Sequence, residues 1–142
     1  MGFLADTNVI SELRKGDRAD PAVYSWYDAQ DDRDIFLSVL TIGEIRRGIE
    51  SVRRRDTRSA LAIDSWLSQI VESHGERILP VDAQVSDRWG RMGVPDPVPA
   101  IDGLLAATAM VHDLTMVTRN VRDVAETGVR YLNPFSGDQS QG

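Results

Sequence analysis

The sequence contains no cysteine among its 142 residues, which excludes disulfide bonds and thiolate metal sites. Histidine is scarce as well. His74 and His112 both lie near the ends of predicted helices, where we expect surface caps or side chains with local partners. No apolar run approaches the roughly 18 residues that a membrane span requires, and the first residues lack the basic and apolar regions of a signal peptide. We therefore expect a cytoplasmic protein without a membrane anchor.

The composition fits one compact domain, because hydrophobic residues make up 42% of the chain and its length leaves no room for a second ordinary domain. We expect this domain to span residues 1–135. The net charge of −6 argues against a protein that coats nucleic acid, since such proteins are usually basic. Positive charge is nevertheless concentrated, because six arginines fall between positions 46 and 58. The charge balance is therefore compatible with a local basic patch.

Short apolar segments alternate with longer segments of helical periodicity along the chain. We expect two helices to start at Pro21 and Thr41, further helices over 8–14, 58–73, 82–92 and 100–112, and strands over 2–6, 35–39, 77–81, 115–118 and 129–132. This alternation is typical of a parallel sheet with helices on both faces. In such a sheet, ligands bind at the carboxyl ends of the strands, where the strand order reverses.

Local signals make several of these predictions more specific. Asp20 followed by Pro21 indicates a helix start, with an N-cap and a proline in the first turn. Thr41 and Glu44 match a capping box, in which each side chain bonds the backbone of the other residue. Trp89 falls on the expected inward face of its helix. The prolines from 95 to 99 predict a stiff loop, and residues 136–142 are typical of a disordered tail.

Four acidic side chains lie at predicted strand ends or early in the segments that follow. They are Asp6 after the first strand, Glu44 after the second, Asp102 at the start of the alanine-rich helix, and Asp123 after the fourth strand. Since strand ends and helix starts share one edge of such a sheet, we expect the four carboxylates to converge. Each acid also has a structural interpretation, as a helix cap, a capping-box partner of Thr41, a helix-dipole partner or a loop acid, respectively.

A group of four unpaired carboxylates is unfavourable, because each negative charge raises the pKa of its neighbours. A hard divalent cation relieves this repulsion, and Mg²⁺ prefers oxygen ligands while it keeps several waters. Such an ion lowers the pKa of a water and offsets charge that builds on a phosphoryl group. The pattern therefore favours hydrolysis of a phosphodiester. In this hypothesis Asp6 and Asp102 are the core ligands, while Glu44 and Asp123 complete the shell or hold a second ion.

Four segments around these acids resemble the motifs of PIN-domain ribonuclease toxins of the VapC and FitB kind. Residues 6–12 (DTNVISE) resemble the opening motif, and residues 42–48 (IGEIRRG) resemble the second. Residues 101–109 (IDGLLAATA) and 118–123 (TRNVRD) resemble the third and fourth motifs. The segment 133–135 (NPF) is similar to the usual end of the family. Any one match is weak, but four in the right order across nearly the whole chain are specific.

This resemblance implies a three-layer α/β/α fold with a central parallel sheet of four to five strands. It implies the toxin of a type II toxin–antitoxin system, an endoribonuclease that a cognate VapB-type antitoxin inhibits. It also implies a homodimer that can assemble further with the antitoxin. The cofactor would be Mg²⁺ or Mn²⁺, and its ligands would be Asp6, Glu44, Asp102 and Asp123.

The resemblance also suggests roles for neighbouring polar residues. Thr7 and Asn120 would orient the metal ligands or a water, whereas Asn8 would mainly fix the turn and Thr118 would be a structural or supporting residue. One departure matters: the family usually has an aromatic residue directly after the fourth acid, and here that residue is Val124. Asn120 could therefore complete the site in place of Asp123.

Two other functions remain open at this point. An aspartate after the first strand also serves as the nucleophile of HAD-type phosphatases, but those enzymes have a second aspartate two residues later, where this chain has Asn8. Alternatively, the protein could be an interaction module without catalysis, although the presence of all four acids argues against a degenerate site. Arg46 and Arg47 are candidates for contact with RNA or a partner, or for a solvated helix face.

Overall fold

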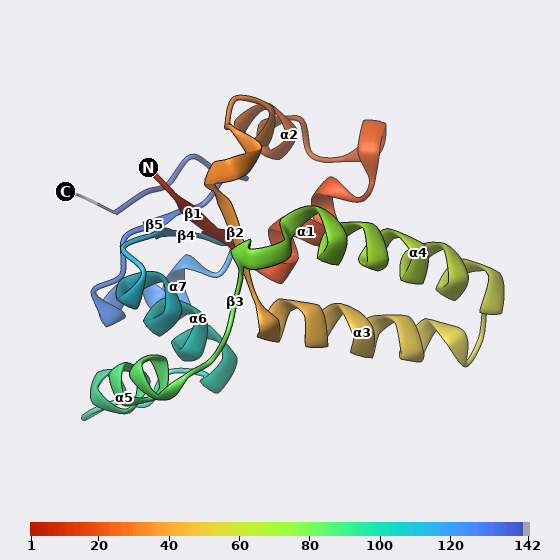
Figure 1. Cartoon of the computed structure of the whole chain (residues 1–142). Coiled ribbons are helices and arrows are strands. Elements are labelled where there is room, and N and C mark those ends of the chain that lie inside the picture. Colours follow the sequence, from red (N-terminus) through yellow and green to blue (C-terminus); the bar gives the residue numbers. More distant parts are fainter. Residues whose placement is uncertain (141–142) are drawn as a thin grey trace.

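The computed structural model describes residues 1–140 and contains five parallel strands with helices on both sides (Figure 1). The strand order is β3-β2-β1-β4-β5, so the first strand lies at the centre. The strands are β1 Phe3–Ala5, β2 Ile35–Ser38, β3 Ile78–Leu79, β4 Thr115–Val117 and β5 Tyr131–Leu132. The helices are α1 Thr7–Leu13, α2 Pro21–Asp28, α3 Val39–Arg53, α4 Thr57–His74, α5 Ala83–Met92, α6 Ala100–Val111 and α7 Val121–Val124. Within the described range, none of these helices combines the length and apolarity of a membrane span.

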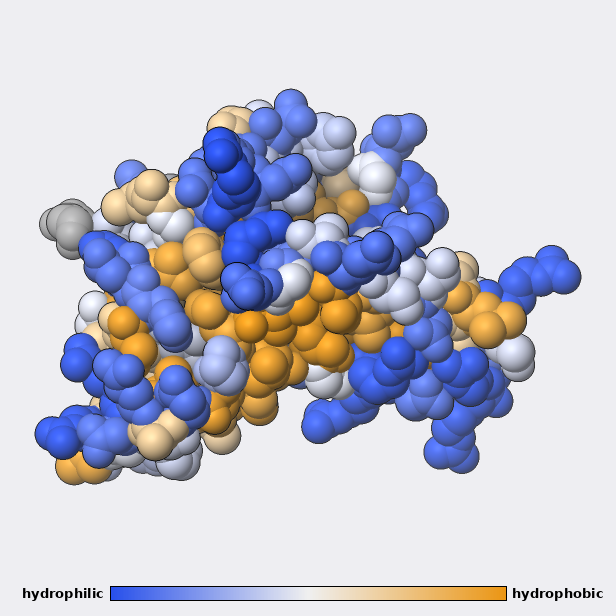
Figure 2. Space-filling view, viewed as in Figure 1, coloured by the Kyte–Doolittle hydropathy of each residue, from blue (hydrophilic) through white to orange (hydrophobic). Residues whose placement is uncertain are grey.

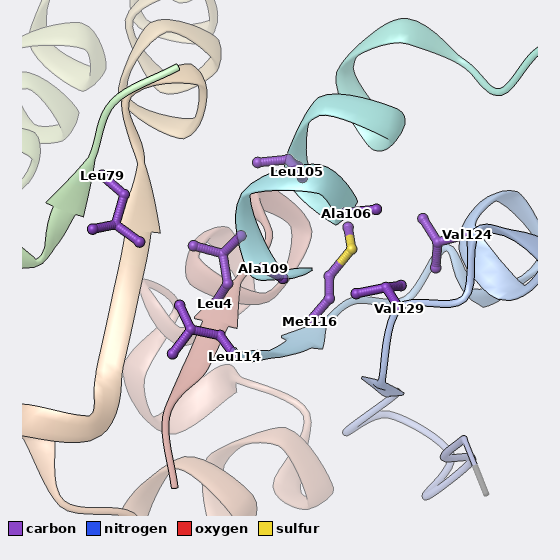
Figure 3. Close-up of a cluster of buried hydrophobic side chains, with 9 residues drawn as sticks. All are labelled: Leu4, Leu79, Leu105, Ala106, Ala109, Leu114, Met116, Val124 and Val129. Atoms are coloured by element: carbon purple, nitrogen blue, oxygen red, sulfur yellow. The ribbon is translucent and has the colours of Figure 1, made fainter. Parts of the chain in front are cut away.

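One face of the sheet is covered mainly by α6, which packs against the two central strands (Figure 3). Leu4 of β1 and Met116 of β4 point toward this helix and meet its buried residue Leu105. Ala106 and Ala109 are also fully buried, and their small side chains let α6 lie close to the strands. The alanine-rich composition of this helix is therefore explained by close packing on the sheet.

The other face of the sheet is covered by α1 to α4. Ala5 and Val117 point to this side, because successive residues of a strand face opposite directions. Leu37 of β2 packs there with Ile45 and Ile49 of α3 in a second buried cluster. Helices α3 and α4 form an antiparallel hairpin that extends beyond the sheet (Figure 1). The sheet therefore lies between two helical layers, and the predicted α/β/α architecture is confirmed.

The helix starts show which local signals operate in the folded chain. Asp20 caps α2 as predicted, because its carboxylate accepts hydrogen bonds from the amides of the first turn and Pro21 is the first helical residue. The predicted capping box is wrong. Helix α3 begins at Val39, because the Ser38 side chain accepts from the amide of Leu40 at 3.0 Å. Thr41 is fully buried inside the first turn, and its hydroxyl has no hydrogen-bond partner among the described residues.

Two further predictions differ from the structure. Trp89 is 39% exposed, and its ring lies against the buried Gly103 of α6, so it covers the start of that helix and is not part of the buried core. The expected disorder is absent from residues 136–140, where the amide of Ser140 donates to the carbonyl of Tyr131 at 2.9 Å. The amide of Asn133 also donates to the carbonyl of Asp138 at 2.7 Å. This segment therefore folds back on β5, whereas residues 141–142 lie outside the described range.

The strand order reverses beside β1. The next strand along the chain, β2, pairs with one edge of β1, whereas β4 pairs with the other edge. The amide of Asp6 donates to the carbonyl of Val117 at 2.9 Å, so the carboxyl ends of β1 and β4 lie at the same level. In open parallel sheets, ligands bind at such a reversal. The fold therefore directs attention to the residues that follow β1 and β4.

Candidate active site

Asp6 lies at the carboxyl end of β1, and only 5% of it is exposed. Its Oδ1 accepts from the amide of Thr7 at 2.7 Å, and its Oδ2 accepts from Thr118 Oγ1 at 2.8 Å and from Asn8 Nδ2 at 3.3 Å. Burial raises the pKa of Asp6 and the charge of Glu44 raises it further, whereas the three hydrogen bonds lower it. Asp6 is therefore a helix cap, as its structural interpretation predicted, and also a carboxylate fixed from two separate segments.

Glu44 lies on α3, where its carboxylate bonds a residue that is distant in sequence. The hydroxyl of Thr7 donates to Glu44 Oε1 at 2.5 Å. The amide of the same threonine donates to Asp6, so Thr7 connects two of the four acids. This contact replaces the predicted partnership between Glu44 and Thr41. The structure thus places Glu44 beside the carboxyl end of β1.

Asp102 lies in the first turn of α6, which starts after Pro99 without a side-chain cap. Partial burial raises the pKa of Asp102 to about 6, and the charges of Asp6, Asp123 and Glu44 contribute to the same shift. The side chain of Asn120 opposes this shift. Since three other acids act on one carboxylate, the structure brings the four predicted residues into one electrostatic neighbourhood.

Asp123 and Asn120 follow β4 and are both exposed. Asn120 precedes the short helix α7, and its amide donates to Thr118 Oγ1 at 2.9 Å. Val124, which stands where the family usually has an aromatic residue, is fully buried in the core beneath α6. Val124 therefore contributes to the core, while the charge of Asp123 still acts on Asp102.

The four carboxylates lack basic partners. Within residues 1–140, the ion pairs all involve other acids, so no cationic side chain offsets the repulsion among Asp6, Glu44, Asp102 and Asp123. An all-oxygen donor set of this kind fits Mg²⁺ or Mn²⁺. In the same part of the chain, no three acidic or histidine side chains are arranged as a closed metal site. The residues therefore fit an ion held by one or two carboxylates, with waters completing its shell.

Comparison with known proteins identifies the family. A model of the PIN domain matches residues 3–128, a range that includes all four acids. The chain belongs to the PIN-domain family. It is 30% identical to the VapC ribonuclease Y4jK of Sinorhizobium fredii, over 94% of this chain and 97% of that protein. It is also 30% identical to toxin FitB of Neisseria gonorrhoeae, over 94% of this chain and 98% of that protein.

A solved structure supports the same assignment. The crystal structure of FitAcB from Neisseria gonorrhoeae contains a chain that superposes on this PIN domain with a TM-score of 0.86 at 30% identity. The match covers 94% of this chain and 99% of the other. Because the PIN-domain match includes strands β1 to β4 and all four acids, the alternative of a HAD-type phosphatase is set aside. The Asn8 amide, which bonds Asp6, occupies the position where that alternative needs a second acid.

Two residues of this PIN domain are more closely tied to the site than the sequence suggested. Thr118 is fully buried and donates to Asp6 while it accepts from the amide of Asn120. Asn8 bonds the Asp6 carboxylate, and its own Oδ1 accepts from the amide of Arg119 at 3.1 Å. These contacts join the ends of β1 and β4, which are more than one hundred residues apart in sequence. The polar pattern around Asp6 was visible in the sequence, but the pairing of its atoms was not.

The two arginines proposed for RNA or partner contact differ in their surroundings. Arg46 forms ion pairs with Asp64 at 3.0 Å and with Glu50 at 3.6 Å, so its guanidinium joins α3 to α4. Arg47 is exposed, and none of the ion pairs within residues 1–140 involves it. The structure therefore favours a structural role for Arg46 and leaves Arg47 as the candidate for contact with RNA or a partner.

Proposed function

We propose that this PIN domain, taken as residues 1–135, is the toxin of a type II toxin–antitoxin system and hydrolyses RNA as a divalent-metal-dependent endoribonuclease. The observation that carries the proposal is the group of acids around Asp102, whose negative charges have no basic partner among the described residues. The relatives named as a ribonuclease and a toxin support it. When bound, Mg²⁺ or Mn²⁺ would lower the pKa of a water and offset charge on the phosphoryl group.

The chain's own residues would hold and orient this centre. Asp6 and Asp102 would be the main ligands, and Glu44 and Asp123 would complete the set directly or through water. Asp6 keeps one lone pair of Oδ1 free after its bond to Thr7, so it can bind an ion without losing its cap. Because Thr7 donates to Glu44 and Asn120 acts on Asp102, both residues would keep ligands in position.

An apolar surface suggests where a partner would bind. Hydrophobic residues gather in a band across the face shown in Figure 2. A groove of about 610 Å³ lies between α3 and α4, and its walls include Val39, Ile42, Leu67 and Val71. We propose that part of a VapB-type antitoxin covers this groove, since exposed apolar patches often mark protein interfaces. The similar chain of FitAcB comes from a toxin–antitoxin complex, which supports an antitoxin partner. The homodimer remains a prediction from the resemblance, and the cytoplasmic location remains a prediction from the sequence composition.

The proposal is tested by incubating labelled total RNA with the purified, antitoxin-free protein and Mg²⁺ or Mn²⁺. We expect discrete cuts that EDTA abolishes and that the Asp6→Asn and Asp102→Asn proteins do not make. Asp17→Asn is the matched control. Asp17 is an exposed acid beyond the C-terminal end of α1, whereas Asp6 caps its N-terminal end, so the variant should cut like wild type. An Asp102→Asn protein that cuts as well as wild type would refute the catalytic scheme.

The same experiment separates a nuclease from an interaction module. A module would bind Mn²⁺ or the antitoxin while the folded wild-type protein leaves every RNA class intact. Titration with Mn²⁺, followed by its electron paramagnetic resonance signal, measures ion binding without reference to cleavage. Ion binding without cutting would favour the interaction module, whereas cutting that depends on Asp102 favours the nuclease.

A further inference from the structure

A cavity adjoins the cluster of four acids (Asp6, Glu44, Asp102 and Asp123) on the side of Asp123. It has a volume of about 300 Å³ and lies between the proline-containing loop 93–99 and the segment that starts with α7. Asp123 forms part of its wall. Pro99, another wall residue, directly precedes α6 and stands three positions before Asp102. The cavity and the candidate active site therefore share a wall, and a chain bound at one would place its next group in the other.

The apolar part of this cavity is stiffened by prolines. Met92 and Val98 are partly buried, and the exposed prolines of the loop form the adjoining wall. Proline has a fixed backbone angle, so this wall changes shape less than an ordinary loop. The volume is at the lower end of the roughly 300–1,000 Å³ typical of small-molecule sites. It therefore suits one nucleotide base better than a larger ligand.

The polar part of the cavity is mainly negative. Asp96, Asp123 and Glu126 line it together with one cation, Arg122. Three carboxylates against one guanidinium repel a second phosphate. The lining instead fits an uncharged group that has N–H donors and an apolar face.

We propose that this cavity binds the base of the nucleotide next to the scissile phosphate, and that Asp96 and Glu126 select guanine there. This inference rests on the proposed nuclease function and specifies its substrate. An ionised carboxylate only accepts hydrogen bonds. Guanine presents adjacent N1–H and N2–H donors to it, whereas uracil presents one N–H between two carbonyl oxygens that the carboxylate repels. Bases of single-stranded RNA are free to enter such a cavity.

The test measures base preference at each position around a mapped cut. Fluorescent single-stranded RNA oligonucleotides would differ only by guanine, inosine or uracil at one position, where inosine lacks the N2 amino group. We expect kcat/KM of the wild type to fall in that order at one position, with roughly a tenfold gap between guanine and uracil. Asp96→Asn and Glu126→Gln should lose most of this gap, because an amide both donates and accepts. The exposed acids Asp17 and Glu76 provide matched controls, Asp17→Asn and Glu76→Gln, which should keep it.

The outcomes separate this inference from the proposed function. If wild type cuts with Mg²⁺ but shows no base preference, or if both cavity variants keep the preference, the inference is wrong and the nuclease stands. If wild type cuts none of the RNAs with either ion, the proposed function fails and the inference fails with it. Fluorescence anisotropy of the same oligonucleotides on Asp102→Asn protein gives a second measure, in which guanine should again bind about tenfold more tightly than uracil.

Discussion

Replacing Asp102 by asparagine should make the metal-free protein more stable while it abolishes cleavage. In the folded chain, burial and neighbouring acids raise the pKa of Asp102 from 3.8 to about 6. The folded state therefore binds this proton more tightly than the unfolded chain does. As the pH rises from about 4 through 6, ionisation costs the folded state more than the unfolded state, and stability falls. At pH 7.5 the full penalty is present, and the neutral amide of the variant removes it.

The magnitude follows from the shift of about two pKa units. At 1.36 kcal/mol per unit, the ceiling is about 3 kcal/mol. Because Asp102 is only partly buried, solvent screening reduces this value, and we expect about 1 kcal/mol. For a domain of this size, that corresponds to a rise of roughly 3–4 °C in Tm. Mg²⁺ offsets the same repulsion, so ion at ten times its Kd should stabilise wild type by about 1.4 kcal/mol.

The assay is thermal unfolding in EDTA at pH 5 and pH 7.5, and in Mg²⁺ at pH 7.5. In EDTA, the Tm of wild type should fall from pH 5 to pH 7.5, whereas the Tm of Asp102→Asn should fall less. The variant should melt above wild type at pH 7.5 in EDTA, and Mg²⁺ should raise its Tm less than that of wild type. A variant that melts below wild type in EDTA at pH 7.5, with an unchanged pH slope, would refute the reasoning.

Three further predictions concern contacts that hold the site and the fold. Thr118→Val leaves the Asp6 carboxylate and the amide of Asn120 without their buried partner. Urea unfolding should therefore show that the free energy of unfolding falls by about 1–3 kcal/mol, and cleavage should be reduced. An unchanged free energy of unfolding would contradict this contact. Arg77→Ala removes three hydrogen bonds to backbone carbonyls, so the free energy of unfolding should fall by about 2–3 kcal/mol. The exposed control Arg91→Ala should lower it by less than about 0.5 kcal/mol. Asp64→Asn breaks the ion pairs between α3 and α4, so its Tm should fall at low salt by an amount that nearly vanishes at 1 M NaCl, and a salt-independent loss would indicate another cause.

Much of the architecture could be predicted from local patterns. The buried strands and the helices between them follow from short apolar runs and helical periodicity, which depend on neighbouring residues only. The start of α2 at Pro21 is a local cap and was predicted correctly. The four acids were also visible, because residues that follow strands reach the same edge of a parallel sheet. What the sequence could not provide was the set of atoms that each carboxylate contacts.

The sequence alone therefore determined the order of the elements and the positions of the acids at strand ends, because both depend on local periodicity. Tertiary structure decided the partners. Thr41 and Glu44 match a capping box in sequence, yet Ser38 caps α3 and Glu44 bonds Thr7 from another helix. Likewise, Thr118 reaches Asp6 only because β4 pairs with β1. The raised pKa of Asp102 also belongs to the fold, since its charged neighbours come from three distant segments.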